Sequence, residues 1–276
     1  MKKALIVVRG GGDLATGVIH RLWNAGFPVV ILEAERPTAI RRQVALCEAV
    51  FEGTACVEGV TAQRIESVEQ AESVLASGRI PLLVDAGGDS IRAIKPAAVV
   101  DAILAKRNLG TGRAMAPLTI ALGPGFVAGE DVDFVIETMR GHNLGRIISR
   151  GAARPNTGVP GKIGGYAAER VIHAAHTGKL VHCHEIGDYV EQGEAIARIE
   201  SEAGAFPVAA TISGLIRGLI RDGFPVEKGL KIADIDPRRE EYDNCFTISD
   251  KARCIAGSVL ELVCRYAGED QAEAAR

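Results

Sequence analysis

The feature that most constrains the fold is an internal repeat in the second half of the chain. Residues 187–199 return as residues 223–235, and at an offset of 36 residues seven of thirteen positions are identical. The match extends upstream, where Thr177-Gly178 corresponds to Ser213-Gly214. Because self-similarity at a fixed offset seldom arises by chance, the repeat predicts two copies of one supersecondary unit that pack on each other.

The repeated pattern, G-x-x-V-x-x-G-x-x-I-x-x-I, resembles the half-motif of biotinyl/lipoyl-type barrels, also called barrel-sandwich hybrids. The resemblance implies a small β-sandwich whose two halves pack around the Val and Ile side chains. Carrier domains of that family hold a lysine, within a Met-Lys pair, at the hairpin between the halves. Residues 200–205 of this chain contain no lysine. We therefore expect neither biotin nor lipoate here.

Two histidines precede the first repeat and raise the question of a metal site. On a strand, His182 and His184 share a face, whereas Cys183 points away from it. Two ligands do not close a zinc site, even with His176 nearby. We expect a solvent-facing edge and no metal.

The first forty residues follow a strand–loop–helix–strand pattern. The apolar run at residues 4–8 predicts a buried parallel strand, and residues 27–32 predict a second one. Between them, Gly10, Gly12 and Ala15 match G-x-G-x-x-A at the start of a helical pattern that ends at Gly26. This arrangement predicts a dinucleotide-binding βαβ unit.

The chemistry of this loop suits a phosphate-bearing ligand. Glycines let the backbone approach a pyrophosphate, the helix N-terminus presents N–H groups, and an acidic residue about 20 positions later, here Glu33, binds the ribose. Arginines at positions 36, 41 and 42 leave the choice between NAD and NADP open. The alternative is a tight strand-to-helix turn without a ligand.

Strands and helices continue to alternate over the first half of the chain. A capping box at residues 67–70 predicts a helix to Gly78, residues 80–85 and 118–122 predict strands, and Pro96 predicts the start of a helix that contains Asp101. Asp85 and the following glycines lie at the carboxyl end of a strand, where such sheets place ligands. The predicted class is α/β: a Rossmann-like doubly wound parallel sheet, a small β barrel-sandwich hybrid domain and a C-terminal helix.

The centre of the chain is basic and rich in glycine. Residues 138–168 contain no Asp or Glu but carry five cations, a local charge of +5 in a chain of net charge −3. Glycine and proline at this density predict a loop. Cations beside exposed backbone N–H groups suit a phosphate or carboxylate, and the alternative is an inter-domain linker.

These observations divide the chain into three parts. Residues 1–168 are predicted to form the α/β domain with the basic loop at its end, and residues 169–237 the duplicated domain. Residues 238–276 are predicted to form a helix that packs back on the α/β domain and a frayed tail from Gly268.

Composition limits the setting and the partners. The chain shows no signal-peptide core and no membrane span, and its six cysteines are scattered, so we expect a cytoplasmic protein. Nucleic acid is a poor candidate ligand, because the chain is mildly acidic and Tyr166 is the one aromatic residue of the basic stretch. The sequence leaves the oligomeric state open, a homo-oligomer included.

Several motifs together resemble accessory proteins of selenium-dependent molybdenum hydroxylase systems, which are distant relatives of the xanthine dehydrogenase maturation factors. They lie at residues 10–17, 123–126, 140–142, 155–161 and 248–251. The resemblance implies a protein that helps to mature a molybdenum enzyme, handling a phosphate-bearing pterin, the molybdenum cofactor, with the hydroxylase as a partner. It carries no established catalytic residue onto this chain.

The leading hypothesis is an accessory or maturation protein that binds a nucleotide or a pterin cofactor. The alternatives are an autonomous NAD(P)-dependent oxidoreductase, with Asp13, Asp85 or His142 as the proton-transfer residue, and a non-catalytic docking module. The expected cofactor-binding residues are Gly10, Gly12, Asp13, Ala15, Thr16, Glu33, Gly123, Gly125, Arg150, Arg154, Asn156 and Lys162.

Overall fold

The computed structural model describes residues 4–158 and 161–274, with side chains up to Tyr266 at the C-terminal end. The chain forms two compact units. The α/β unit comprises Met1–Pro37, Ala45–Asn156 and Ile248–Arg276, and the repeat unit comprises Thr38–Val44 and Thr157–Thr247. The repeat unit therefore includes a short segment from the region that the sequence assigns to the α/β domain.

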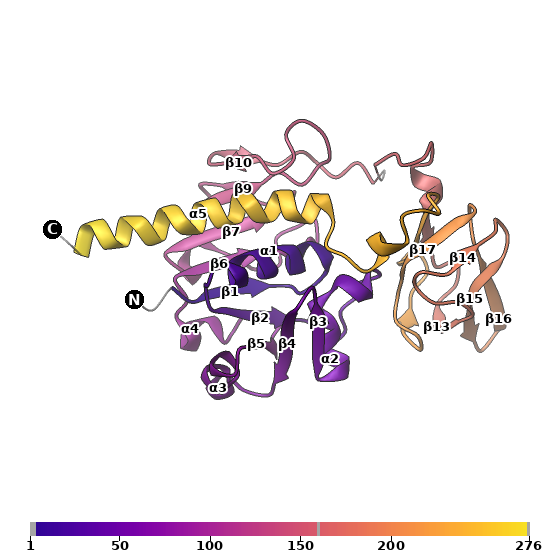
Figure 1. Ribbon diagram of the computed structural model, residues 1–276, viewed down its shortest axis with the longest axis horizontal. Coiled ribbons are helices and arrows are strands. Elements are labelled where there is room, and N and C mark those ends of the chain that lie inside the picture. The colour runs from indigo at the N-terminus through magenta and orange to yellow at the C-terminus, as the bar shows by residue number, and fades with distance from the viewer. Residues whose placement is uncertain (1–3, 159–160, 275–276) are drawn as a thin grey trace. The chain divides into compact units, whose positions relative to one another are not determined.

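A nine-stranded sheet forms the centre of the α/β unit (Figure 1). It is parallel except at its two edge strands, which confirms the prediction of an α/β fold with a mostly parallel sheet. In spatial order the strands are β10 (Ile147–Ile148), β9 (Phe134–Ile136), β7 (Leu118–Leu122), β6 (Ala98–Asp101), β1 (Ile6–Arg9), β2 (Val29–Glu33), β5 (Ile80–Val84), β4 (Val60–Ile65) and β3 (Thr54–Val57).

The chain order of the strands reverses between β1 and β6. From β1 the chain moves to β2 on one side, and it later returns to β6 on the other side before adding β7 and β9. Open α/β sheets bind ligands in the crevice outside the carboxyl ends of the strands at such a reversal. The loops after β1 and β6 therefore mark the first place to look for a site.

Two long helices cover one face of the sheet. Helix α1 (Asp13–Asn24) follows β1, and α5 (Asp250–Ala274) packs along it (Figure 1). A Cβ atom built on Gly17 would lie 2.7 Å from the Cβ of Ala252, so the close approach of the two helices requires this glycine. Helix α5 continues to Ala274, although the sequence predicts a frayed tail from Gly268.

Short elements complete the α/β unit. Gln70 and Ser67 form the predicted capping box at η3 (Val68–Gln70), which leads into α3 (Ala71–Ala76). The remaining elements are α2 (Ala49–Glu52), α4 (Ile91–Ile94), η2 (Leu46–Glu48), η4 (Arg113–Met115) and a two-stranded sheet of β8 (Val127–Ala128) and β11 (Gly151–Ala152). No helix among the described residues is long and apolar enough to span a membrane.

The prediction of a helix after Pro96 is wrong. The segment forms β6, whose four residues are all buried between β1 and β7. Lys95 adopts a left-handed conformation (φ 50°) that ends α4 just before the proline. A continuous apolar run after a proline fits the first turn of a helix and a fully buried parallel strand equally well, and the neighbouring strands decide between them.

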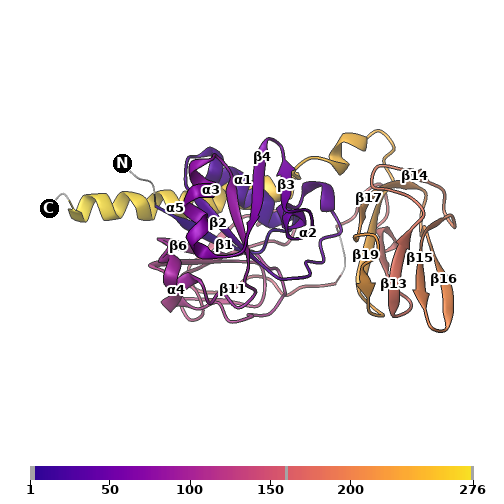
Figure 2. The same ribbon diagram turned by 90° about the horizontal axis from the view of Figure 1, so that it is seen from below.

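The repeat unit consists of two four-stranded antiparallel sheets (Figure 2). One contains β12 (Val171–His173), β19 (Lys231–Asp236), β17 (Gly214–Leu219) and β14 (Tyr189–Val190). The other contains β16 (Gly204–Ala209), β15 (Ala195–Ser201), β13 (Gly178–His182) and β18 (Pro225–Val226). Shorter elements are η1 (Arg42–Val44), η5 (Ala168–Arg170) and η6 (Tyr242–Cys245).

The two copies of the repeat exchange strands. Copy 1 (residues 177–201) supplies β13, β14 and β15, and copy 2 (residues 213–237) supplies β17, β18 and β19. The short middle strand of each copy pairs with the other copy, because β14 pairs with β17 and β18 pairs with β13. The two copies thus form one interlocked unit, as the sequence repeat predicts.

Candidate functional site

The glycine loop after β1 is shaped by its neighbours. Gly10 has φ +99°, and a Cβ atom on it would lie 2.9 Å from the carbonyl oxygen of Ala102, just after β6. Gly12 is different, because a Cβ atom built on it would have no neighbour within 4 Å. Gly12 precedes α1, and no side chain caps the start of this helix. Gly12 is therefore where an outside molecule can approach the backbone.

Glu33 lies at the carboxyl end of β2 and binds this loop. Its Oε2 accepts a hydrogen bond from the N–H of Gly11 at 2.7 Å, and its Oε1 accepts one from the N–H of Ala34 at 2.7 Å. Burial raises the pKa of Glu33, although the two N–H groups, of Ala34 and Gly11, act in the opposite direction. The predicted acidic residue thus lies next to the predicted glycine loop.

Thr16 and Ala15 follow the glycine loop in the first turns of α1. Both are fully buried. The Thr16 hydroxyl donates to the carbonyl of Gly11 at 3.1 Å and accepts the N–H of Leu46 at 3.0 Å. The N–H of Cys47 donates to the same Gly11 carbonyl at 2.9 Å. Thr16 thus fixes the Gly11 backbone from within the protein, and both predicted residues are buried.

A buried cation lies at the strand reversal. Arg9, at the end of β1, is 1% exposed, and its guanidinium donates to Thr111 Oγ1 and to the carbonyl of Ala86, the latter at 2.7 Å. The Thr111 hydroxyl in turn donates to Asp101 Oδ2 at 2.5 Å. Burial raises the pKa of Asp101, outweighing the opposing effects of Thr111, the Ile103 N–H and Arg9. Arg9 thus links the end of β1 to the loops that follow β5 and β6 through hydrogen bonds.

Asp85, at the end of β5, has a local structural role. Its carboxylate accepts the N–H groups of Gly88, Asp89 and Ser90 at 2.8, 3.1 and 2.9 Å, and the Ser90 hydroxyl at 2.5 Å. Burial raises the pKa of Asp85, but these hydrogen bonds outweigh it and hold the pKa below its ordinary value. The carboxylate organises the turn before α4.

The loops after β7 and β9 meet at the same edge of the sheet. A Cβ atom on Gly123 would lie 2.6 Å from Thr138 Oγ1, and one on Gly125 would lie 2.6 Å from the nitrogen of Arg107. Glu137 follows β9 directly, and its Oε2 accepts the N–H of Arg154 at 2.9 Å. The two predicted glycines are thus needed for close loop packing.

The first turn of α5 brings an amine to this edge. Lys251 is half-buried, and none of the hydrogen bonds among the described residues involves its ammonium group. Burial lowers the pKa of Lys251, and Arg140 adds to this effect, while Asp13, Glu137 and Asp250 oppose it. Arg140 itself forms two 2.8 Å hydrogen bonds to the carboxylate of Asp250.

The charged residues of the predicted basic loop do not lie at one place. The antiparallel strand β10 carries the chain to the amino end of β9, where Ser149 lies against Gly129, so Arg150 follows at the opposite end of the strands from the glycine loop. The chain returns through β11, and Arg154 reaches Glu137 at the carboxyl ends. Lys162 belongs to the repeat unit.

The other predicted residues of this region are exposed or fall outside the description. Asn156 and His142 are exposed, as are the side chains of both arginines named above. Val159 and Pro160, within the motif at residues 155–161, lie outside the described residues.

Sequence reasoning missed four residues at this edge: Arg9, Asp101, Glu137 and Lys251. Three of them, all but Asp101, left a signal in the sequence. Arg9 is a charge directly after an apolar strand, Glu137 is the last acid before the acid-free stretch, and Lys251 ends one of the quoted motifs.

The two histidines that precede the first repeat, His182 and His184, interact with protein groups. His182 Nε2 donates to the carbonyl of Ile220 at 2.7 Å, and its Nδ1 lies 3.3 Å from Glu185 Oε1. His184 lies between Asp188 and Glu194, at 3.4 and 3.1 Å. Within the described ranges, no group of three His, Cys, Asp or Glu side chains is arranged to hold a metal ion.

The chain is similar to an uncharacterized protein of Escherichia coli strain K12, YqeB. The two are 51% identical over 258 residues, which cover 93% of this chain and 47% of that protein. The chain therefore spans about half the length of this curated relative. No family model matches the chain.

Solved structures give only weak likenesses. A succinylglutamate desuccinylase/aspartoacylase from Rhodobacter sphaeroides has a TM-score of 0.29 and 14% identity, covering 86% of each chain. The ectoine utilization protein EutE (DoeB) from Ruegeria pomeroyi has a TM-score of 0.27 and 10% identity, covering 84% of this chain and 85% of that one. TM-scores this low carry no information on function.

Proposed function

We propose that the α/β unit binds a nucleotide or a phosphate-bearing pterin at the carboxyl ends of its parallel strands, and that the chain serves as an accessory protein for a molybdenum hydroxylase. The proposal assigns the nine-stranded sheet to the Rossmann-like class and the repeat unit to the barrel-sandwich hybrids. The ligand phosphate lies over Gly12 and the start of α1.

The observation that carries the proposal is the bond between Glu33 and the glycine loop. A buried carboxylate at the end of β2 accepts the N–H of Gly11, and the open position at Gly12 follows directly. The loop lies beside the strand reversal, where such sheets bind dinucleotides. The sequence resemblance supplies the second support, since it names the enzyme system.

The electrostatics of the edge are compatible with a phosphate. The N-terminal ends of α1 and α5 carry the positive ends of their helix dipoles, and Lys251 adds an ammonium group near Asp13. A phosphate that comes within reach of Lys251 favours the protonated amine, because a nearby anion raises a lysine pKa. Binding is therefore expected to take up a proton at alkaline pH.

Calorimetry with NAD, NADP, AMP, GMP and the isolated molybdenum cofactor, the last under anaerobic conditions, tests the proposal. Binding to none of them contradicts it. The informative variant is Gly12→Val, because Gly12 has an extended backbone (φ −66°, ψ −176°) and open space around its Cβ position. A valine there should lower the unfolding temperature only slightly, because valine is a poorer N-cap residue than glycine, and should reduce binding by more than tenfold.

Gly112→Val provides the matched control. Gly112 also precedes a helix in an extended conformation (φ −142°, ψ 160°) and has open space around its Cβ position, but it lies outside the motif. Binding should survive this substitution. Equal binding by Gly12→Val and the unmodified chain would place the ligand elsewhere.

One observation favours a second function, that of an NAD(P)-dependent oxidoreductase. Such an enzyme needs a proton-transfer group at the ligand, and the lowered pKa of Lys251, caused first by burial, suits an amine for that role. Turnover of NAD(P)H with a defined carbonyl substrate, abolished in Lys251→Met, would support it. Binding without turnover, together with co-purification of a molybdenum hydroxylase, favours the accessory function.

A further inference from the structure

Residues Thr38–Val44, here called the inserted segment, lie between two stretches of the α/β unit but belong to the repeat unit. The inserted segment is bound to β17 through backbone and side-chain groups. The N–H of Leu219 donates to the carbonyl of Ile40 at 2.8 Å, and Arg42 Nε donates to the carbonyl of Leu219 at 2.8 Å. The repeat unit thus holds a piece of chain that starts and ends in the α/β unit.

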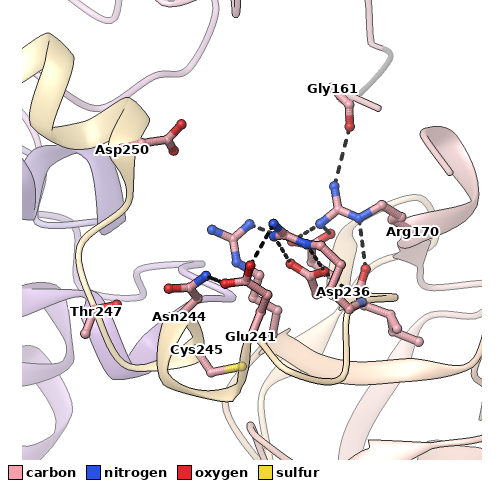
Figure 3. A network of polar contacts seen from close by, with 12 residues as sticks. Gly161, Arg170, Asp236, Glu241, Asn244, Cys245, Thr247 and Asp250 are labelled. Atoms are coloured by element: carbon pink, nitrogen blue, oxygen red, sulfur yellow. Dashed lines mark hydrogen bonds and ion pairs between the residues drawn. The ribbon is translucent and has the colours of Figure 1, made fainter. Parts of the chain in front are cut away.

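Arg41 joins the inserted segment to a second connection between the units. This arginine is 6% exposed, and its Nη2 donates to the carbonyls of Asn244 and Thr247 at 2.9 and 3.1 Å. Figure 3 shows both acceptor residues on the stretch of chain that leads into α5. Thr247 is the last residue of the repeat unit, and α5 begins shortly after it. One buried guanidinium therefore binds two of the connections.

Residues near both ends of the inserted segment bind the glycine loop after β1. Before the segment, Glu33 accepts the N–H of Gly11 at 2.7 Å. After the segment, the N–H of Leu46 donates to the Thr16 hydroxyl at 3.0 Å, and the N–H of Cys47 donates to the Gly11 carbonyl at 2.9 Å. The inserted segment therefore leaves from the glycine loop and returns to it.

The return connection is short and buried. Only Ala45 separates η1 (Arg42–Val44), in the repeat unit, from η2 (Leu46–Glu48), in the α/β unit. Residues 44–47 are each at most 1% exposed. Because buried residues are closely packed, a displacement of η1 must also displace η2, and with it the N–H of Cys47 that binds Gly11.

We propose that Arg41 is a positioning residue for the proposed nucleotide site. By binding the inserted segment and the chain before α5, it keeps the glycine loop and Lys251 in the arrangement that binds the ligand. The inference rests on the proposed function for the identity of the site, and it adds a role for the repeat unit. Arg41 acts through η2 and the first turn of α5, without contact to the ligand.

Cys47 provides a readout in the α/β unit that a structural role confined to the repeat unit would not change. Its side chain is fully buried, and a Cβ atom on Gly11 would lie 3.2 Å from the Cβ of Cys47. The thiol can therefore react only when η2 opens away from the glycine loop. Cys56 and Cys264 are exposed and serve as internal references.

The test measures alkylation of the ligand-free chain by N-ethylmaleimide, cysteine by cysteine, with peptide mass spectrometry. It is done at a temperature at which circular dichroism shows every variant to be folded. In Arg41→Met, which loses two charge-assisted hydrogen bonds, Cys47 should react about tenfold faster relative to Cys56. Arg41→Lys should recover part of the protection, because its ammonium can still donate to a carbonyl. An unchanged Cys47 rate in Arg41→Met would overturn the proposal.

Gly218→Val tests the same contact from the other side, and replaces Arg41→Met if that variant does not fold. The three atoms nearest to a Cβ on Gly218 all belong to Ile40, at 3.2 Å. A valine there displaces the inserted segment while Arg41 is kept, so Cys47 should again react faster. A Cys47 rate equal to that of the unmodified chain would contradict the proposal.

Gly178→Ala is the matched control for destabilisation of the repeat unit. The added Cβ clashes with the carbonyl of Glu200 in copy 1 and touches no residue of the inserted segment. Cys47 should react as slowly as in the unmodified chain. Equal acceleration in Gly178→Ala and Arg41→Met would mean that any weakening of the repeat unit exposes Cys47, and it would overturn the assignment to Arg41.

Calorimetry with NAD, NADP, AMP and GMP measures the effect on the site itself. Arg41→Met should weaken nucleotide binding about tenfold, Arg41→Lys less, and Gly178→Ala not at all. Equal affinity in Arg41→Met and the unmodified chain would overturn the proposal. Gly12→Val should lose nucleotide binding but keep the slow Cys47 reaction. If the unmodified chain binds no nucleotide, the proposed function fails, and the Cys47 rates, measured without ligand, still decide whether Arg41 positions the glycine loop.

Discussion

The two copies of the repeat place corresponding strand positions in opposite surroundings. In copy 1, Arg198 and Glu200 of β15 form a surface pair at 2.9 Å, with side chains 46% and 44% exposed. In copy 2, the corresponding residues are Asp234 and Asp236 of β19, which are 7% and 1% exposed. The same fold position thus carries a solvated pair in one copy and a buried charge network in the other.

The difference comes from what covers each copy. Residues from outside the repeat cover copy 2: Arg170 binds Asp234, and the segment Thr38–Val44 lies along β17, where the N–H of Leu219 donates to the carbonyl of Ile40 at 2.8 Å. Because β19 is covered, its polar side chains need hydrogen-bond partners inside the protein. Two repeated sequences therefore adopt the same backbone fold, but the segments that pack against each copy decide whether its side chains are exposed or buried.

Removal of the central carboxylate should have the largest effect. Asp234→Ala leaves the buried guanidinium of Arg170 without its carboxylate, and breaking a buried ion pair costs about 3–5 kcal/mol. Urea unfolding of the repeat unit should report a loss of this size. A loss below about 1 kcal/mol would mean that the network is solvated and that the contrast between the copies is not real.

The glycines that open each copy should respond alike. A Cβ atom on Gly178 would lie 2.3 Å from the carbonyl oxygen of Glu200, and one on Gly214 would lie 2.3 Å from that of Asp236. Because backbone atoms cause both clashes, Gly178→Ala and Gly214→Ala should each cost about 1–3 kcal/mol. Unequal costs in urea unfolding would show that the shared backbone is tighter in one copy.

Acid should distinguish the two copies through Asp236. Burial alone would raise the pKa of Asp236, but hydrogen bonds from Arg238 outweigh it and lower the pKa. The resulting stabilisation is present above the ordinary aspartate pKa of about 3.9 and is lost as the pH falls through the lower native value. Arg238→Met should cost about 1 kcal/mol at neutral pH, because Arg238 is partly exposed and its interactions are screened.

The Arg238→Met variant should also shift the pH at which acid unfolds the protein. Without Arg238, burial dominates, the native pKa of Asp236 rises, and acid unfolding begins at a higher pH. Circular dichroism between pH 7 and pH 2 measures this shift. Arg198→Met, which removes the exposed partner of Glu200, should leave the acid midpoint unchanged, and an equal shift in both variants would contradict the assignment.

The smallest effects should come from the exposed pair. Arg198→Ala and Glu200→Ala should each change the free energy of unfolding by less than about 0.5 kcal/mol, because exposed ion pairs contribute little. A double-mutant cycle measures their coupling. A coupling above about 1 kcal/mol would indicate that copy 1 is covered in solution, as copy 2 is.

Local sequence patterns were enough to predict the first strands, the glycine loop and the position of Glu33. In each case the signal is carried by neighbouring residues: an apolar run, a glycine at a required positive φ, and a charge at the end of a strand. The repeat likewise predicted a duplicated β unit, because its Val and Ile spacing is local.

What the sequence could not supply is the assembly of distant segments. Asp101 was placed in a helix because its apolar surroundings fit either state, and only the pairing of β6 with β1 and β7 resolves this. Arg9 meets Thr111 across 102 positions, and Lys251 reaches the site edge from the end of the chain. Contacts of this range leave no periodicity in the sequence.

The exchange of β14 and β18 between the copies has a consequence for how the unit can be divided. In a single copy expressed alone, the short middle strand, β14 or β18, would lack its pairing partner. Such a copy could complete its sheets only with a second chain. Each copy is therefore equivalent to one subunit of a strand-swapped dimer, fused here into one polypeptide. Folding of the unit should be all-or-none across both copies, and a cut between residues 201 and 213 should yield two fragments that reassociate.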